Sequence, residues 1–167
     1  RSNMMPPLSE AELEKLSVYI RLVRNYLMDY SELNYLQPDK EEFLNESISQ
    51  AILMALEIFN SCIGHITKYN LVNFPVPTLL VIGGCAYTLF SGGILQARNH
   101  FSVSDGNTSG PVSEKTDLYR AWGQEMLNNF LSLSTKFKEC KNMDAAYGNF
   151  SSNYLLAHFY RDESIKI

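Results

Sequence analysis

The sequence lacks the common motifs of catalysis, nucleotide binding and metal binding. It contains no GxxxxGK[ST] phosphate loop, no HExxH zinc motif, no GxSxG nucleophile turn and no EF-hand calcium loop. Its three histidines, His65, His100 and His158, are far apart in the chain, and no two of them show metal-ligand spacing. We therefore expect no enzymatic activity, no cofactor and no bound metal.

Cysteine is scarce and unpaired in the sequence. Cys62, Cys85 and Cys140 are widely spaced and include no CxxC pair, which excludes the framework of a disulfide-rich secreted domain. Cys62 and Cys85 fall on apolar faces of predicted helices, as inert core thiols do. The first residues, RSNMMPP, carry no signal-peptide pattern. These features predict a protein of a reducing compartment.

An excess of positive charge is also missing. The 14 Lys and Arg residues are outnumbered by 18 Asp and Glu residues, which gives a net charge of −4. A chain of this balance has no general attraction to nucleic acid phosphates. With 167 residues, of which 46% are apolar, the chain is long enough for one domain with a substantial core.

The centre of the chain lacks charge altogether, from Tyr69 to Ala97. This stretch could span a membrane, form the core of a soluble helical protein, or be covered by other subunits. A spanning helix needs about 20 consecutive apolar residues. The continuous apolar part, Leu79 to Phe90, is shorter, and no cluster of Lys or Arg marks one flank. We expect a buried helix, with a small membrane-associated protein as an alternative.

Two amphipathic helices precede this stretch. Ser9 and Glu12 have the spacing of a capping box and predict a helix from about 9 to 29. Asp39 and Glu42 predict a second capped helix, which ends near Asn60 to Gly64. The apolar stripes of the two helices are Leu13, Leu16, Ile20, Val23 and Leu27, then Leu44, Ile48, Ile52, Leu56 and Phe59.

Two further helices are expected after Pro75. Pro77 suits the first turn of a helix that begins near Thr78, and the small residues 83–86 allow another backbone to approach closely. Ser113 or Thr116 is expected to cap a fourth helix. Its predicted core stripe is Tyr119, Trp122, Met126, Phe130, Leu133 and Phe137. Near its C-terminus, where the helix dipole favours cations, lie Lys136, Lys138 and Lys141.

Two segments do not follow a helical period. Residues 99–112 alternate weakly around Asp105-Gly106, a dipeptide typical of two-residue turns, and predict a short projecting β-hairpin. Residues 150–167 form an aromatic C-terminal arm that either folds back on the body or inserts into a partner. We therefore expect one mainly α domain, a bundle of about four helices around a central hydrophobic helix. Its helical body covers about 9–149.

The order of these signals resembles a family of proteins from the head-to-tail neck of tailed bacteriophages, the adaptor or head-completion connector proteins. The likeness covers roughly residues 17 to 155. It is carried by the stretches RNYLMDYSELNYL, PDKEEFLNESISQAILMALEIFN, NLVNFPVPTLLVIGGCAYTLFSGGILQARNHFSVSDGN, SEKTDLYRAW and KFKECKNMDAAYGNFSSNYL. The most specific pieces are DYSELN, FPVPTLLVIGG and ARNHFSVSDG, which report fold and assembly and not chemistry.

The resemblance implies a structural virion protein, assembled in the bacterial cytoplasm. Such a subunit would form a homo-oligomeric, dodecameric ring beneath the portal, extend the DNA channel without sequence-specific DNA binding, and carry the next neck or tail protein. It implies that the hairpin meets the neighbouring subunit or the channel lumen and that the arm docks on the portal. The candidate hairpin contacts are Arg98, Asn99, His100, Asp105 and Gly106, and the candidate arm contacts are Tyr154, Leu155, Phe159 and Tyr160.

A second hypothesis needs no virion. A monomeric helical module could bind or regulate another protein by seating a peptide in a groove between the 79–90 helix and its neighbours. An enzyme is the least favoured reading, because the sequence places no acid, base and nucleophile together.

Overall fold

The fold is mainly α-helical, as the sequence predicts. A computed structural model describes residues 8–33, 40–64, 67–98 and 112–147, and none of these residues is in a β-strand. The predicted hairpin at 99–112 lies outside the described residues except for Val112, and the arm at 150–167 lies wholly outside them. The helices are α1 (Glu10–Leu27), the short 3-10 helix η1 (Ser31–Leu33), α2 (Asn45–Ser61), α3 (Pro77–Arg98) and α4 (Val112–Tyr147).

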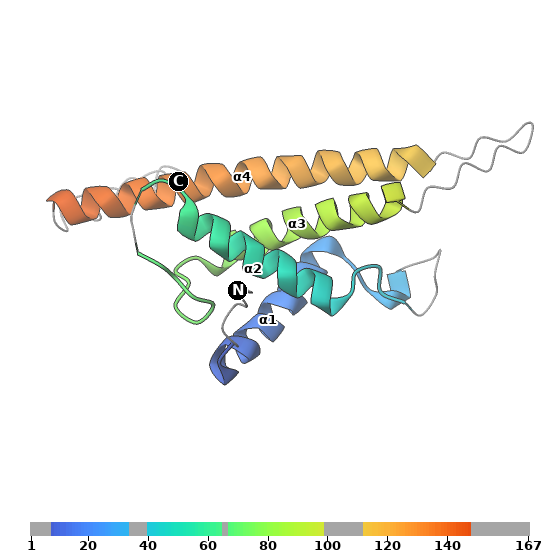
Figure 1. The fold of residues 1–167 in the computed structure, drawn as a ribbon, viewed down its shortest axis with the longest axis horizontal. Helices are drawn as coiled ribbons and strands as arrows, with labels where there is room; N and C mark the ends of the chain where they lie inside the picture. Colours follow the sequence, from blue (N-terminus) through green and yellow to red (C-terminus); the bar gives the residue numbers. More distant parts are fainter. Residues whose placement is uncertain (1–7, 34–39, 65–66, 99–111, 148–167) are drawn as a thin grey trace, which may run out of the picture.

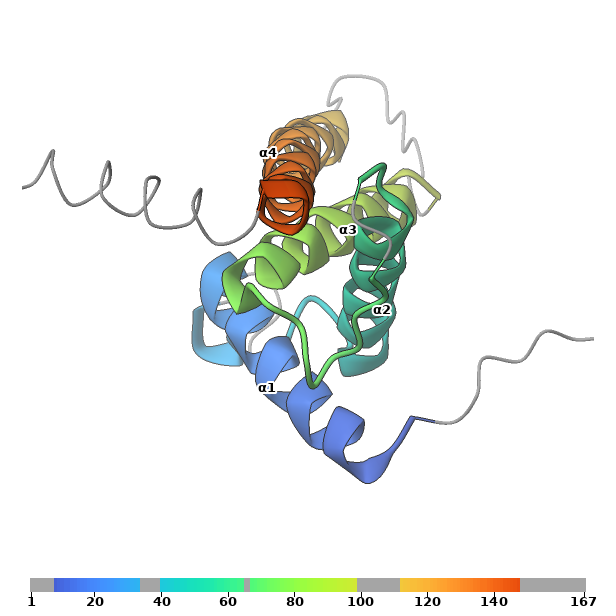
Figure 2. The ribbon, with the colours of Figure 1, turned by 90° about the vertical axis from the view of Figure 1, so that its left-hand side faces the viewer.

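The central hydrophobic helix, α3, lies between two layers. The long helix α4 runs antiparallel along one side of α3, while α1 and α2 lie on its other side (Figures 1 and 2). By length and composition α3 could cross a membrane, yet 56% of its most apolar window is buried inside the fold. Because α3 contacts α1, α2 and α4, it forms the core of a helical bundle.

The small residues of α3 bring its neighbours close, as expected. A Cβ atom at Gly83 would lie 2.8 Å from the Cβ atom of Ala55 on α2 and 2.9 Å from the ring of Phe130 on α4. Only a residue without a side chain fits between these two helices. Around it, each large apolar side chain that is fully buried stabilises the fold by roughly 1.5–3 kcal/mol. The largest of these are Val23, Ile48, Ile52, Phe59, Leu71, Leu80 and Phe130.

The predicted start of α1 is confirmed. The backbone N–H of Glu12 donates to Ser9 Oγ at 3.4 Å, and the backbone N–H of Ser9 donates to Glu12 Oε2 at 3.0 Å. The helix ends at Met28, which has a left-handed backbone with φ 54°. This conformation is unusual for a residue with a side chain, and it turns the chain sharply towards η1.

The predicted start of α2 is wrong. The helix begins at Asn45, and its N-cap residue, Leu44, makes no side-chain capping bond. Glu42 does not close a capping box; its backbone N–H and that of Phe43 donate to the carboxylate of Asp29 at 2.8 and 3.1 Å. A carboxylate from the end of α1 therefore binds the backbone before α2, and Asp39 lies outside the described residues.

The predicted face of α4 is partly wrong. The helix begins at Val112, so both Ser113 and Thr116 lie inside it and neither is its cap. Tyr119 and Phe130 are buried as expected, but Trp122 and Leu133 are exposed. Gly123 and Ser134, one residue further on, are buried in their place. Small residues at these positions let α4 lie close to α3, and the two large side chains turn outwards.

The three lysines near the end of α4 were expected to complement the dipole of that helix. Lys138 is 1% exposed and its side chain binds the end of α2 instead. Lys136 and Lys141 are exposed. The helix also continues to Tyr147, beyond all three residues, so Lys138 lies more than two turns before its last residue.

Candidate functional site

A buried ion pair fixes the turn between α1 and α2. Arg24 Nη1 lies 2.8 Å from Asp29 Oδ2, and Arg24 Nη2 donates to the carbonyl oxygen of Phe43 at 2.7 Å. Nη2 also donates to Asn45 Oδ1 at 2.8 Å and lies 2.7 Å from Glu41 Oε2. A buried charge is stable only when its hydrogen-bonding groups are satisfied. This arginine therefore serves as a structural clamp on residues 29–45.

The same turn is tied to the start of α4. Lys115 Nζ lies 2.7 Å from Glu42 Oε1. Burial, followed by a hydrogen bond with the Glu42 carboxylate, raises the pKa of Tyr119 above its ordinary value. The hydroxyl of Tyr119 therefore stays protonated at neutral pH and can serve as a donor to Glu42. Together these contacts hold the α1–α2 turn opposite the first turns of α4.

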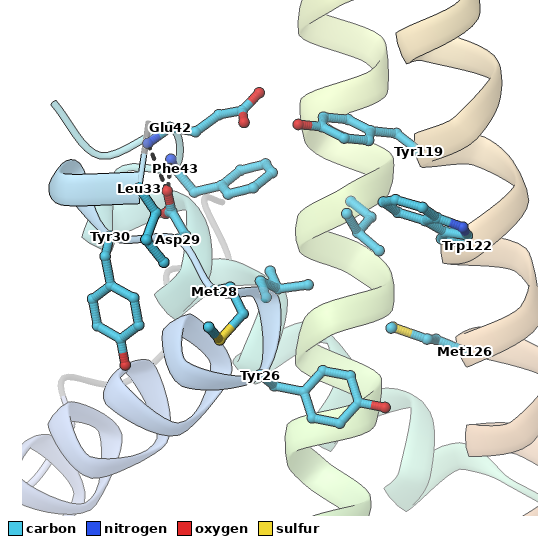
Figure 3. Close-up of a pocket in the computed structure, with 12 residues that line it drawn as sticks. Tyr26, Met28, Asp29, Tyr30, Leu33, Glu42, Phe43, Tyr119, Trp122 and Met126 are labelled. Carbon is cyan, nitrogen blue, oxygen red and sulfur yellow. Dashed lines mark hydrogen bonds between the residues drawn. The ribbon is translucent and has the colours of Figure 1, made fainter. Parts of the chain in front are cut away.

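The first candidate surface is the groove that these contacts create, named here the α1–α4 groove. It has a volume of about 280 Å³. Figure 3 shows Tyr26, Met28 and Leu33 on one side of the groove and Trp122 and Met126 of α4 on the other. Met28 is 61% exposed and Trp122 is 51% exposed. Large aromatic and methionine side chains of this kind are enriched in the centres of protein interfaces.

The second candidate surface lies between α2 and α3 and is named the α2–α3 groove. It is larger, with a volume of about 500 Å³. Its lining includes Ala51 and Met54 of α2 and Tyr87, Phe90 and Ile94 of α3. Ser47, Gln50 and Ser91 complete it, so no lining residue carries a formal charge.

The two grooves lie on different sides of α3. Leu89 lines the α1–α4 groove, whereas Tyr87, Phe90 and Ile94 line the α2–α3 groove. At 3.6 residues per turn the latter three residues share one face of α3, and Leu89 points away from it. In Figure 2, α1 and α2 both lie on the side of α3 that faces away from α4, with α1 to the left and α2 to the right. The subunit therefore has two distinct grooves: the α2–α3 groove is uncharged, whereas the α1–α4 groove combines exposed aromatic and methionine side chains with Asp29 and Glu42.

A functional site among the described residues could also consist of metal ligands or of the buried thiol of α3. Residues 8–33, 40–64, 67–98 and 112–147 contain no cluster of three His, Cys, Asp or Glu side chains that could hold a metal ion. Burial raises the pKa of the Cys85 thiol to about 12, so this thiol is neutral and inert at physiological pH. All three histidines lie outside the described residues.

Of the site residues predicted from sequence, only Arg98 lies among the described residues. Arg98 is exposed at the last position of α3. The other predicted contacts lie outside the described residues: Asn99, His100, Asp105, Gly106, Tyr154, Leu155, Phe159 and Tyr160.

Sequence reasoning missed the α1–α4 groove. Tyr26 and Met28 sit where the apolar period of α1 breaks, and Trp122 was assigned to the core. The pair Trp122-Gly123 was the available signal. A glycine allows close packing of a helix, and the large residue next to it then faces outwards. No family model, no curated protein and no solved structure matches this chain.

Proposed function

We propose that this protein is a structural subunit of a tailed-phage neck. In this proposal, copies of the chain form a ring beneath the portal, extend the DNA channel and join the head to the tail. The ring would be dodecameric, and the subunit would have no enzymatic activity, cofactor or metal. It would be assembled in the host cytoplasm and belong to the virion neck.

The observation that carries this proposal is the pair of grooves on different sides of α3, one uncharged and one that exposes Met28 and Trp122. A ring requires a heterologous interface, in which one surface of each subunit binds a different surface of the next. A subunit with two separate, chemically different grooves meets that requirement.

The charge balance also fits a channel subunit. The chain carries a net charge of −4. A channel lined by many Lys and Arg side chains would bind phosphates and hold DNA, whereas a weakly acidic lining lets DNA slide. We therefore propose that DNA passes through the ring without sequence-specific contacts.

Two segments outside the described residues have a place in this proposal. The segment 99–111, which ends where α4 begins at Val112, would form a hairpin next to Arg98 that contacts the neighbouring subunit or faces the lumen. The arm at 150–167 would contact a partner, and the resemblance makes the portal one candidate for it. The next neck or tail protein would bind the opposite side of the ring.

A pull-down against the assembled portal ring tests this proposal. We expect the wild-type chain to be retained by the portal ring and Trp122→Glu to be retained less if the α1–α4 groove contributes to assembly. Leu133→Glu is a matched control, because Leu133 is 46% exposed on the same helix and lines neither groove. A wild-type chain that is not retained by the portal ring contradicts the proposal.

The α2–α3 groove also favours a second candidate, a monomeric helical module that binds a peptide. The groove is uncharged, has a volume of about 500 Å³ and lies between two helices, as in helix-in-groove recognition. This candidate predicts that a chain without residues 150–167 keeps its partner, whereas the neck proposal predicts loss of binding. The two are distinguished by the same pull-down with the truncated chain.

A further inference from the structure

We propose that the α2–α3 groove of one subunit binds residues 150–160 of a second copy of the same chain. These residues are named here the aromatic segment. The inference rests on the proposed ring and deepens it, because it names the contact between neighbouring copies. Its basis is the match between an uncharged groove, an uncharged segment and the length of chain that joins them.

The groove is suited to an apolar occupant. Met54 is 54% exposed and Ile94 is 62% exposed, and these residues form opposite walls. Ala51, on α2, is buried in the lining of the groove. Its small side chain leaves room for a large ring. Covering such walls removes apolar area from water and stabilises the complex by about 25 cal/mol per Å² of buried area.

The aromatic segment has the matching chemistry. Between Asp144 and Arg161 the sequence contains no Asp, Glu, Lys or Arg. The segment carries Phe150, Tyr154, Leu155, Leu156, Phe159 and Tyr160.

The α1–α4 groove fits this segment less well, because Asp29 and Glu42 belong to its lining. Glu42 is partly exposed in its ion pair with Lys115, and covering this pair with an uncharged segment would remove it from water without a new polar partner. An uncharged segment therefore matches the α2–α3 groove, whose lining carries no formal charge.

The geometry of α4 separates the segment from the groove of its own chain. Gly83 packs against Phe130, and the groove begins at Tyr87, one turn further along α3. Because α3 and α4 are antiparallel, Tyr87 lies further from Tyr147 than Phe130 does (Figure 1). At about 1.5 Å per residue, α4 rises roughly 26 Å from Phe130 to Tyr147, and Tyr87 lies about 6 Å beyond.

The chain after Tyr147 is too short to cover this distance with the whole segment. Fully extended, it spans at most about 25 Å from Tyr147 to Tyr154 and about 29 Å to Leu155. Both values are below the roughly 32 Å that separates Tyr147 from the groove along the helix axis. The backbone of Tyr154 and Leu155 therefore cannot reach their own groove. Phe159, at up to about 43 Å from Tyr147, can reach it, so only the groove of another copy can accept the whole segment.

This contact is heterologous, because the donor surface and the acceptor surface differ. Each copy donates a segment to the next and accepts one from the previous, and such contacts close into rings when the rotation allows it. The segment would then bind a sister copy in place of the portal.

Light-scattering mass measurement of purified full-length chains tests the inference. The wild-type chain should exceed its monomer mass of 19.0 kDa increasingly as its concentration rises. A groove variant, Met54→Glu with Ile94→Glu, and a segment variant, Leu155→Glu with Phe159→Glu, should each remain monomeric. The control variant, Leu13→Glu with Leu133→Glu, changes exposed residues outside both grooves and should associate like the wild type.

Mixing the two monomeric variants gives the decisive result. The groove variant keeps an intact segment and the segment variant keeps an intact groove, so a one-to-one mixture should form a heterodimer of twice the monomer mass. Unchanged circular dichroism spectra would show that both variants are folded. A mixture that stays monomeric, or a wild-type chain that stays monomeric at concentrations near its solubility limit, overturns the inference.

Portal pull-downs with the same variants separate this inference from the proposed function. If the segment variant alone loses the portal while no variant changes the mass of the free chain, the portal occupies the segment and the inference is wrong. If the chain associates through the groove but the wild type does not bind the portal, the inference stands and the proposed function fails.

Discussion

The side-chain nitrogen of Lys138, on α4, donates a hydrogen bond of 2.8 Å to the carbonyl oxygen of Cys62 at the end of α2. It also donates to the carbonyl oxygen of Asn60 at 3.2 Å and lies 5.2 Å from the centre of the Phe59 ring. The last carbonyls of a helix have no intrahelical partner, and a cation there is favoured by the helix dipole. One buried lysine thus joins α4 to α2 across the bundle.

Replacing this lysine by a residue of similar length should destabilise the fold. We expect Lys138→Met to lower the free energy of unfolding by about 2–3 kcal/mol, because two carbonyl oxygens lose a charged donor. Urea denaturation followed by circular dichroism measures the change. Lys136→Met is the control, since Lys136 is exposed, and it should change stability by less than about 0.5 kcal/mol. Equal effects of the two substitutions would contradict a stabilising role for the bonds from Lys138 to the end of α2.

The approach of α2 and α4 at Gly83 gives a second prediction. Gly83→Ala should destabilise the protein by roughly 1–3 kcal/mol, because its Cβ atom would lie 2.8 Å from that of Ala55. Gly93→Ala is the matched control on the same helix, where the nearest side-chain atom would be 3.6 Å away. It should stabilise the helix by up to about 1 kcal/mol. If both substitutions stabilise the protein, α2 and α4 do not pack as closely around Gly83 as described.

The two carboxylates that bind Arg24 should differ in importance. Asp29 is buried and Glu41 is exposed, although both lie within 2.8 Å of the guanidinium. Asp29→Asn removes the buried partner of Arg24 and leaves it only the exposed Glu41, so it should lower stability by roughly 3 kcal/mol. Glu41→Gln removes an exposed partner and should lower stability by less than about 1 kcal/mol. Thermal unfolding of the two variants tests the difference, and a larger effect at Glu41 would refute it.

The buried thiol of α3 predicts how stability depends on pH. Burial raises the pKa of Cys85 from its ordinary value of 9.0 to about 12. Above pH 9 the unfolded chain loses this proton while the folded chain keeps it, so stability should fall as pH rises from about 9 to 12. The decline should be shallower in Cys85→Ala, as measured by urea denaturation across this range. A steeper or unchanged decline in the variant would contradict the enclosure of Cys85.

How much the sequence predicted depended on the distance over which each signal acts. The capping box at Ser9 was predictable because its two partners lie three residues apart. The start of α2 was not, because the carboxylate that binds the backbone before it belongs to Asp29, on the far side of a turn. No pattern of residues 39–42 alone carries that information.

The side-chain pattern of α4 failed for a different reason. A stripe of large apolar residues predicted that Trp122 and Leu133 point into the core, but close helix packing is made by small residues. Gly123 packs against Ala86 and Phe90 of α3 and Ser134 is buried, while the large side chains next to them face solvent. The misassigned Trp122 then became part of a candidate interface that the sequence did not reveal.

The central claim is that copies of this chain form a ring on the portal in which neighbouring copies cover exposed grooves of the subunit, the α2–α3 groove above all. Electron microscopy of the purified chain bound to portal rings tests it most directly. We predict a coaxial ring of this chain beneath the portal, with the α2–α3 groove at each contact between neighbours. A chain that stays unbound, or a ring whose contacts leave both grooves open to solvent, would contradict the claim.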